Sequence, residues 1–286
     1  MGSFTNKTIQ IVMAMAEGVF SNGANHITVE GLPTSVNIQK QGGDERPPCE
    51  VTIGNLNIDV VRQLTTLSFR PLQRYKNQIT INAGDVGTQL QTVFVGDFEN
   101  AYGNFTNAPT MELKVKAIAA QHGALTASPA TSVDGTEQVS YLMEQWAREA
   151  GCTLENNGVN ASVRNAVYSG SPVDKAKALA REVGIELIID DNKFIILPKG
   201  KAVEGNAVLV DKDHGLLGYP TFSNDGIEFR SIFDPTFRIG GLVKVTSIVP
   251  RASGTWKITK LNTKLEAYMP SGGAWESSVS ATFVQE

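Results

Sequence analysis

The sequence is poor in the residues from which many enzymes and disulfide-rich domains are built. Its 286 residues include two cysteines, Cys49 and Cys152, and three histidines, His26, His122 and His214. Two distant thiols without a CxxC motif form neither a disulfide framework nor a zinc site. We therefore expect both cysteines to be small buried residues in a protein made in a reducing cytoplasm.

Positive charge is also scarce, and long apolar runs are absent. Lysine and arginine total 25 and aspartate and glutamate total 29, which gives a net charge of −4. A protein that binds DNA through its phosphates needs a basic patch, so the negative net charge argues against a DNA-binding protein of this class. It does not argue against a protein that forms a channel through which DNA passes. No segment approaches the ~18 apolar residues of a membrane span. The apolar start IQIVMAMA is interrupted by Gln10 and lacks the basic start of a signal peptide, so no membrane insertion is expected.

The motifs of the common catalytic classes are missing. The sequence has no GxSxG, HExxH, P-loop or GxGxxG motif. A Cys–His pair is not excluded by spacing alone, but neither cysteine lies in a recognisable nucleophile elbow. Asp97 and Glu99 have a spacing that glycosidase acids can have, although surface strands carry such pairs routinely. We expect no catalytic, cofactor-binding or metal-binding residues, and no cofactor.

Three kinds of charged group in loops have ordinary structural explanations. They are the cluster of Asp211, Asp213 and His214, the acidic pairs Asp44-Glu45 and Asp190-Asp191, and the basic cluster of Lys193, Lys199 and Lys201. The carboxylate–histidine cluster could bind a metal, but no second cluster stands ready to complete the site. The acidic pairs are expected in turns, and the basic cluster is too small to drive nucleic-acid binding.

The first region, to about residue 125, is expected to be mainly β-strands. In TIQIVMAM, Ile9, Ile11 and Met13 share one face of a strand with a period of two. The stretch MELKVKAIA has the same alternation, which is typical of an antiparallel strand with one solvent-exposed face. Between them, IDVVRQLTTL predicts a short helix that Asp59 can cap.

The second region, about 133–198, is expected to be a compact α/β module. A small, polar stretch at 122–136 precedes it and is typical of a linker. The spacing of apolar residues predicts a helix over TEQVSYLMEQWAREA that ends at Gly151. A second helix is predicted to begin at Ser171-Pro172 and to stop at Gly184. IELIID and KFIILP then predict a hairpin around Asp191-Asn192.

The third region, about 205–286, returns to short strands separated by turn residues. In GIEFRSI, Ile227, Phe229 and Ser231 alternate with charged or exposed positions. Regular short strands with turn signals are typical of a small barrel or sandwich. The expected fold class is mainly β with α+β: two small β-barrel or sandwich domains, at 1–125 and 205–286, flanking the α/β module at 133–198.

The third region contains the stretch GLLGYPTFSNDGIEFRSIFDPTFRIGGLVKVTS, from Gly215 to Ser247, followed by GTWKITKLNTKLEAY. In these residues it resembles the central baseplate hub proteins of contractile-tailed bacteriophages. The strand–loop–strand stretch TVFVGDFENAYGNFTNAPTMELKVKA in the first region is similar to these proteins as well. The middle region looks like the small αβ modules that interrupt hub proteins.

This resemblance implies a structural role and a set of partners. Hub proteins form a homotrimer in which each subunit contributes two tube-like β domains, so that six domains form a ring. That ring joins the sixfold tail tube to the threefold spike and lines the DNA channel, which DNA crosses without specific binding. The implied partners are the tail tube and tail spike proteins, with tape measure and baseplate wedge proteins as further candidates. The implied location is the virion tail baseplate, assembled in the host cytoplasm.

Two other functions are compatible with the sequence. One is a tail-associated peptidoglycan hydrolase, which would need a general acid and a second carboxylate or a metal in a cleft. The other is a component at the base of a type VI secretion spike, because such spikes resemble the hub fold. Sequence alone does not separate phage from secretion use.

Overall fold

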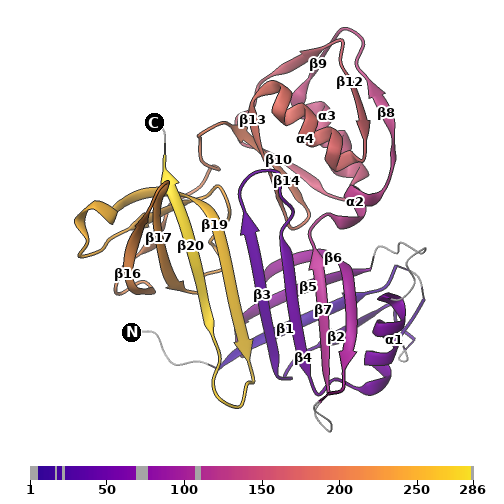
Figure 1. The fold of residues 1–286 in the computed structure, drawn as a ribbon, viewed down its shortest axis with the longest axis vertical. Coiled ribbons are helices and arrows are strands. Elements are labelled where there is room, and N and C mark those ends of the chain that lie inside the picture. The colour runs from indigo at the N-terminus through magenta and orange to yellow at the C-terminus, as the bar shows by residue number, and fades with distance from the viewer. Residues whose placement is uncertain (1–5, 17, 21–22, 69–76, 107–110, 285–286) are drawn as a thin grey trace. The chain divides into compact units, whose positions relative to one another are not determined.

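The protein consists of two compact units, each assembled from segments that are distant in the sequence (Figure 1). The computed structural model describes residues 6–16, 18–20, 23–68, 77–106 and 111–284. The first unit comprises Met1–Gln39, Pro48–Ile118 and Asn262–Ser277, and the second comprises Lys40–Pro47, Ala119–Leu261 and Ser278–Glu286. The expected class, mainly β with α+β, is confirmed, but no sheet in the described residues closes into a barrel. The division into domains at 1–125, 133–198 and 205–286 stays a prediction.

The first unit is built on an antiparallel sheet. Its elements are β1 (Lys7–Ala14), β2 (His26–Val29), β3 (Thr34–Gln41), β4 (Pro48–Gly54), α1 (Ile58–Ser68), β5 (Gln78–Asp85), β6 (Gln91–Asn104) and β7 (Glu112–Ile118). The strands are hydrogen-bonded in the order β3-β4-β7-β6-β5-β1-β2. Ile9, Ile11 and Met13 of β1 are buried, which confirms the face predicted from their spacing.

Helix α1 packs against β6, and a glycine makes the close approach possible. A Cβ on Gly103 would lie 2.6 Å from a methyl carbon of Val61, so a larger residue would push the helix away. The backbone N–H of Gly103 also donates to the hydroxyl of Thr65 at 3.0 Å. The prediction that Asp59 caps this helix is wrong. Asn57 does so, because its side-chain oxygen is the one that accepts from the backbone N–H of Asp59, at 2.8 Å.

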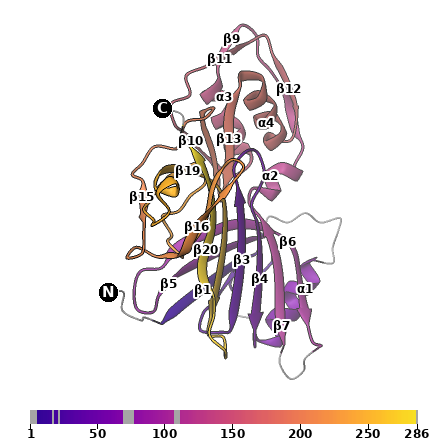
Figure 2. The same cartoon turned by 60° about the vertical axis from the view of Figure 1, so that its left-hand side comes forward.

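The α/β part of the second unit contains three helices, of which α2 is short, and several short strands. Its elements are α2 (Gln121–Leu125), β8 (Ser128–Ser132), β9 (Thr136–Gln138), α3 (Val139–Glu149), β10 (Thr153–Asn156), β11 (Ser162–Arg164), β12 (Val167–Gly170), α4 (Pro172–Val183), β13 (Ile185–Asp190) and β14 (Lys193–Pro198). β10, β14 and β13 form one sheet, and β9 and β11 form a separate two-stranded sheet (Figure 2). The linker expected at 122–136 is wrong, because α2 and β8 occupy much of it and β8 pairs with β12.

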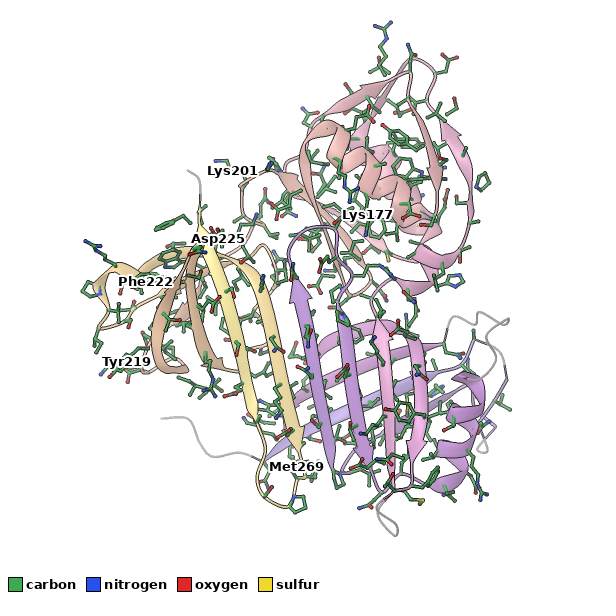
Figure 3. All side chains as sticks on the ribbon, viewed as in Figure 1. Lys177, Lys201, Tyr219, Phe222, Asp225 and Met269 are labelled. Atoms are coloured by element: carbon green, nitrogen blue, oxygen red, sulfur yellow. The ribbon has the colours of Figure 1, made fainter. Side chains whose placement is uncertain are left out.

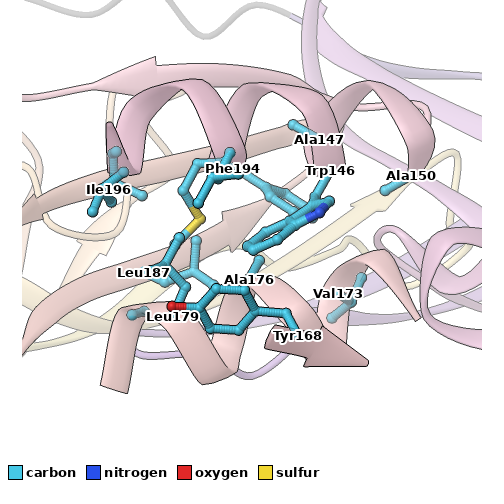
Figure 4. Packing of buried hydrophobic residues seen from close by; sticks show 14 of the residues in the cluster. Trp146, Ala147, Ala150, Tyr168, Val173, Ala176, Leu179, Leu187, Phe194 and Ile196 are labelled. Atoms are coloured by element: carbon cyan, nitrogen blue, oxygen red, sulfur yellow. The ribbon is translucent and has the colours of Figure 1, made fainter. Parts of the chain in front are cut away.

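The two predicted helices of the module are confirmed, but α3 begins only at Val139, because Thr136–Gln138 form strand β9. Ser171 and Asp174 form a reciprocal capping box at the start of α4, and Gly184 ends that helix with φ 73°. Trp146 of α3 is fully buried and meets Tyr168 edge-on, with ring centroids 5.2 Å apart (Figure 4). The apolar stripe of α3 is therefore core.

The third part of the chain forms an open antiparallel sheet with one parallel pair. Its elements are β15 (Val208–Val210), β16 (Leu216–Ser223), β17 (Gly226–Ile232), β18 (Leu242–Val245), the 3-10 helix η1 (Pro250–Ala252), β19 (Gly254–Ala267) and β20 (Trp275–Phe283). Within the second unit the order is β16-β17-β20-β19-β18-β15, so β16 and β15 are the edges. Ile227, Phe229 and Ser231 are buried, as their alternation predicts.

Hairpin β13–β14 belongs to two hydrophobic cores at once. Leu187, Phe194 and Ile196 face the core that contains Trp146. Their neighbours Ile188 and Ile195 face the core formed by β15–β20. Because successive side chains of a strand point to opposite faces, the hairpin is a shared wall between the two cores.

Candidate assembly surface

The carboxylates with glycosidase-like spacing do not share a face. Asp97 lies in β6 and is 5% exposed. The pairing of β6 with β7 is irregular between Phe98 and Asn100, which leaves Glu99 as the extra residue of a bulge. Glu99 is exposed and forms an ion pair with Lys116 at 2.8 Å. The bulge therefore separates the two carboxylates instead of presenting them as an acid pair.

The histidines make local contacts. Nδ1 of His214 lies 2.7 Å from a carboxylate oxygen of Asp211, and this hydrogen bond, with the backbone N–H groups of Asp213 and His214, lowers the pKa of Asp211. His122 lies in α2 within 3.4 Å of the hydroxyl of Thr126. Within the described residues, no group of three or more metal-ligating side chains comes together.

The two cysteines are buried, as expected, and no disulfide joins them. No helix in the described part of the chain has the length and apolarity needed to cross a membrane.

A small cavity in the second unit is too small for a substrate. Its volume is about 30 Å³, and Val203, Thr236, Arg238 and Leu242 are among its lining residues. Sites for small molecules usually occupy several hundred Å³. The guanidinium of Arg238 is already held by the carboxylate of Glu155 at 3.2 Å. The cavity therefore offers room for about one water molecule.

The acidic pairs expected in turns have further contacts that the sequence did not reveal. Asp191 does take a turn conformation, with φ 51°. In addition, Asp190 and Asp191 both bind the ammonium group of Lys40, and Asp44 binds Arg181. These partners are separated by more than a hundred residues, so no local pattern could have paired them. In the basic cluster, Lys193 lies 3.6 Å from Glu155.

The most distinctive surface feature is the edge hairpin β16–β17. Opposite the single residue Phe229, β16 has three residues, Gly218, Tyr219 and Pro220. Gly218 has φ 73°, and Pro220 has no N–H to offer. Bulges and prolines on an edge strand hinder the addition of a further strand there. The same bulge leaves the side chain of Tyr219 65% exposed (Figure 3).

Further apolar side chains are exposed in the same β15–β20 sheet. Phe222 on β16 is 57% exposed although its cross-strand partner Ile227 is fully buried. Phe283, at the end of β20, is 69% exposed and lies against Trp256 with ring centroids 4.3 Å apart. Large exposed aromatic residues are typical of protein–protein contacts. We name the exposed side chains of Tyr219 and Phe222, both on the edge strand β16, the aromatic edge.

The Gly-Tyr-Pro segment of β16 belongs to the stretch that carries the family resemblance in the sequence. The signal for exposure was available in the sequence, because a proline inside a strand assigns that strand to an edge. Aromatic residues on both sides of Pro220 then become candidates for a contact surface. The arrangement can form contacts, and no cluster of metal-ligating side chains is present among the described residues.

Comparison with known proteins gives a family match over most of the chain. A sequence model described as baseplate hub gp41 matches residues 8–268. A search of curated protein sequences finds no match.

Several solved structures have a similar fold at low sequence identity. A tail protein from Neisseria meningitidis MC58 is 10% identical, with 96% of each chain covered and a TM-score of 0.64. The 43 kDa tail protein of prophage MuSo2 from Shewanella oneidensis is 11% identical, with 96% of each chain covered and a TM-score of 0.61. An E. coli protein described as a type VI secretion component similar to the T4 tail proteins gp27 and gp5 is 11% identical, with 89% of this chain and 74% of that one covered and a TM-score of 0.61.

Proposed function

The chain belongs to the baseplate hub gp41 family, and from this premise we propose that it is the homotrimeric hub that joins a sixfold tail tube to a threefold spike. It is a structural protein of the phage-tail type and a component of the tail. In the proposed assembly its β domains form a ring around the DNA channel. The protein would then have no catalytic centre, and its partners would be the tail tube and spike proteins.

The observation that carries this proposal is the open sheet of the β15–β20 region with its aromatic edge. Exposed aromatic side chains are a liability for a protein that stays alone in solution. A closed ring of subunits covers such side chains, since each subunit contacts its neighbour. The mild net charge of −4 fits a channel wall that does not hold DNA through its phosphates.

The oligomeric state of the purified protein tests the proposal directly. Light scattering after size exclusion should give three times the 30.7 kDa mass of the chain, alone or after addition of the matching spike protein. A chain that stays monomeric and binds neither spike nor tube protein would contradict the proposal.

A second candidate is the base of a type VI secretion spike. It is favoured by the fold similarity to the E. coli type VI secretion component. The genes that surround the coding sequence distinguish the two, because a tail gene cluster and a secretion gene cluster encode different neighbours.

The hydrolase alternative has a separate test. Zymography on bacterial cell walls should give no clearing with the wild-type chain. Clearing that is lost in Asp97→Asn or Glu99→Gln would replace the structural proposal with an enzymatic one.

A further inference from the structure

The chain passes from the first unit into the second and back again at the hairpin between β3 and β4. Most of β3 and all of β4 lie in the first unit, whereas Lys40–Pro47 belong to the second unit through their contacts. We call these eight residues the docking hairpin. Their sequence, KQGGDERP, contains no large apolar side chain. Two adjacent glycines, with Gly43 at φ 90°, give its backbone more freedom than other residues would.

The base of the docking hairpin is held by a buried ionic contact. The ammonium group of Lys40 lies 2.7 Å from a carboxylate oxygen of Asp190 and 3.2 Å from one of Asp191, at the turn of β13–β14. The side chains of Lys40 and Asp190 are only 10% and 11% exposed. Burial alone would lower the pKa of Lys40, but the two carboxylates outweigh it and raise that pKa above its ordinary value. The charge of Lys40 is therefore kept, and salt screens this contact little.

The tip of the docking hairpin is held by a second, exposed contact. A carboxylate oxygen of Asp44 lies 2.7 Å from the guanidinium of Arg181 and 4.0 Å from the ammonium group of Lys177, both on α4. The side chain of Arg181 is 75% exposed. An exposed ion pair of this kind is weak and is screened by salt.

The docking hairpin lies outside both hydrophobic cores of the second unit. Among the described residues, neither apolar cluster of the second unit includes a residue from 40 to 47. The other contacts are polar: the backbone N–H of Gly42 donates to the carbonyl oxygen of Thr259 at 2.7 Å, and Arg46 binds the side chain of Gln121. The hairpin can therefore leave the α/β module without opening either hydrophobic core.

We propose that the docking hairpin is an ionic latch, with a permanent anchor at Lys40 and a releasable catch at Asp44. With the catch closed, the tip is fixed to α4. With the catch open, the tip is free while the buried contact of Lys40 still holds the base. The two glycines beside Asp44 allow the tip to move on its own. This inference concerns the single chain and does not depend on the proposed hub function.

Hydrogen exchange of the full-length protein tests the latch, with the backbone amides from Gln41 to Arg46 as the readout. In the wild-type protein, raising the salt from about 0.05 M to about 1 M should speed their exchange about two- to fivefold, because salt screens the exposed pair. Asp44→Asn should give the same acceleration at low salt and should no longer respond to salt. Amides of α3 should exchange at unchanged rates in all cases.

Glu45→Gln is the matched control, because Glu45 is exposed and is the adjacent acidic residue of the same hairpin. It should leave both the exchange rate and its salt dependence unchanged. Equal exchange in the wild-type protein and Asp44→Asn at low salt would overturn the latch. Faster exchange throughout α3 in Asp44→Asn would also overturn the latch. The ion pair of Asp44 with Arg181 would then support the whole module instead of fixing the tip alone.

Discussion

At the scale of single residues, buried lysines determine several local arrangements. Lys175 of α4 is fully buried, and Lys257 of β19 is 5% exposed with its ammonium group 2.7 Å from Glu186. A buried charge is tolerated only where partners replace water. Lys175 meets this condition through three oxygen atoms of β8, on Ser128, Pro129 and Thr131. The lysine thus attaches β8 to the module, in a stretch whose sequence looks like a linker.

Replacing Lys175 should therefore loosen β8. In Lys175→Met the apolar stem of the side chain is kept, but the carbonyl of Pro129 and the hydroxyls of Ser128 and Thr131 lose the hydrogen bond from Lys175, and Thr131 keeps only the one from Trp146. We expect a loss of about 2–4 kcal/mol in the free energy of unfolding, measured by urea denaturation. Lys177→Met on the same helix is the control and should cost less than about 1 kcal/mol. Equal effects of the two substitutions would contradict the role given to Lys175.

Glu266 should make the protein sensitive to acid. The backbone N–H of Ala274 donates to its carboxylate at 2.9 Å, and with Lys264 and Ser35 it lowers the pKa of Glu266 below its ordinary value of 4.5, against the opposing effect of burial. A carboxylate with a lowered pKa stabilises the fold above its unfolded pKa, and this contribution is lost as the pH falls through the folded pKa.

We therefore expect wild type and Glu266→Gln to differ in urea midpoint near pH 7 and to converge as the pH falls below 4.5. Measurement at several pH values between about 3 and 7 checks this. Glu276→Gln, a change of the same kind on β20, is a suitable comparison. A constant difference between wild type and Glu266→Gln over the whole range would rule out the titration of Glu266 as the cause.

At the scale of elements, hairpin β13–β14 links the α/β module to the β15–β20 sheet. Its strands IELIID and KFIILP are nearly continuous apolar runs, which is typical of strands covered on both faces. The sequence therefore predicts the hairpin, and its apolar runs also indicate that neither face of the hairpin is exposed to solvent. Shared packing of this kind makes two regions unfold together, because neither core is complete without the hairpin.

Two tryptophans allow us to measure whether the α/β module and the β15–β20 sheet unfold together. Trp146 lies in the core of the module and Trp256 in the core of the β15–β20 sheet, so each reports one region. In a Trp275→Phe background, variants that keep one of the two should give coincident urea transitions. Ile195→Ala and Ile196→Ala should each cost about 2–4 kcal/mol although they face different cores. Two separate transitions would indicate that the module is an independent insertion.

Much of the local structure could be predicted from the sequence, whereas the long-range contacts could not. Helix α4 has its cap and stop signals within its own sequence, and β17 has strict alternation, so both were predicted correctly. The strand β8 was missed because its backbone pairing with β12 and the donors from Lys175 come from distant residues. The contact of Lys40 with Asp190 is likewise invisible to periodicity.

At the scale of the whole molecule, family membership and an open sheet both favour a role as a subunit of a larger assembly. The chain belongs to a family of baseplate hub proteins, and similar folds cover almost its whole length in solved tail proteins. The aromatic edge, which sequence reasoning had not identified as a surface, lies on the region that first suggested the family. In the proposed homotrimer, a second copy of the chain would cover this surface.

Removing the aromatic edge should then weaken self-association without unfolding the protein. Tyr219 and Phe222 are 65% and 57% exposed, so Tyr219→Ser with Phe222→Ser should change the thermal midpoint little. If their side chains are buried between subunits, the double variant should associate at least about 30-fold more weakly, since a central aromatic contact is worth about 2 kcal/mol or more. Sedimentation over a range of concentrations measures this. Tyr141→Ser, which removes a 58% exposed tyrosine from α3, should leave the association unchanged. Wild-type association of the double variant would place the subunit contact elsewhere on the chain.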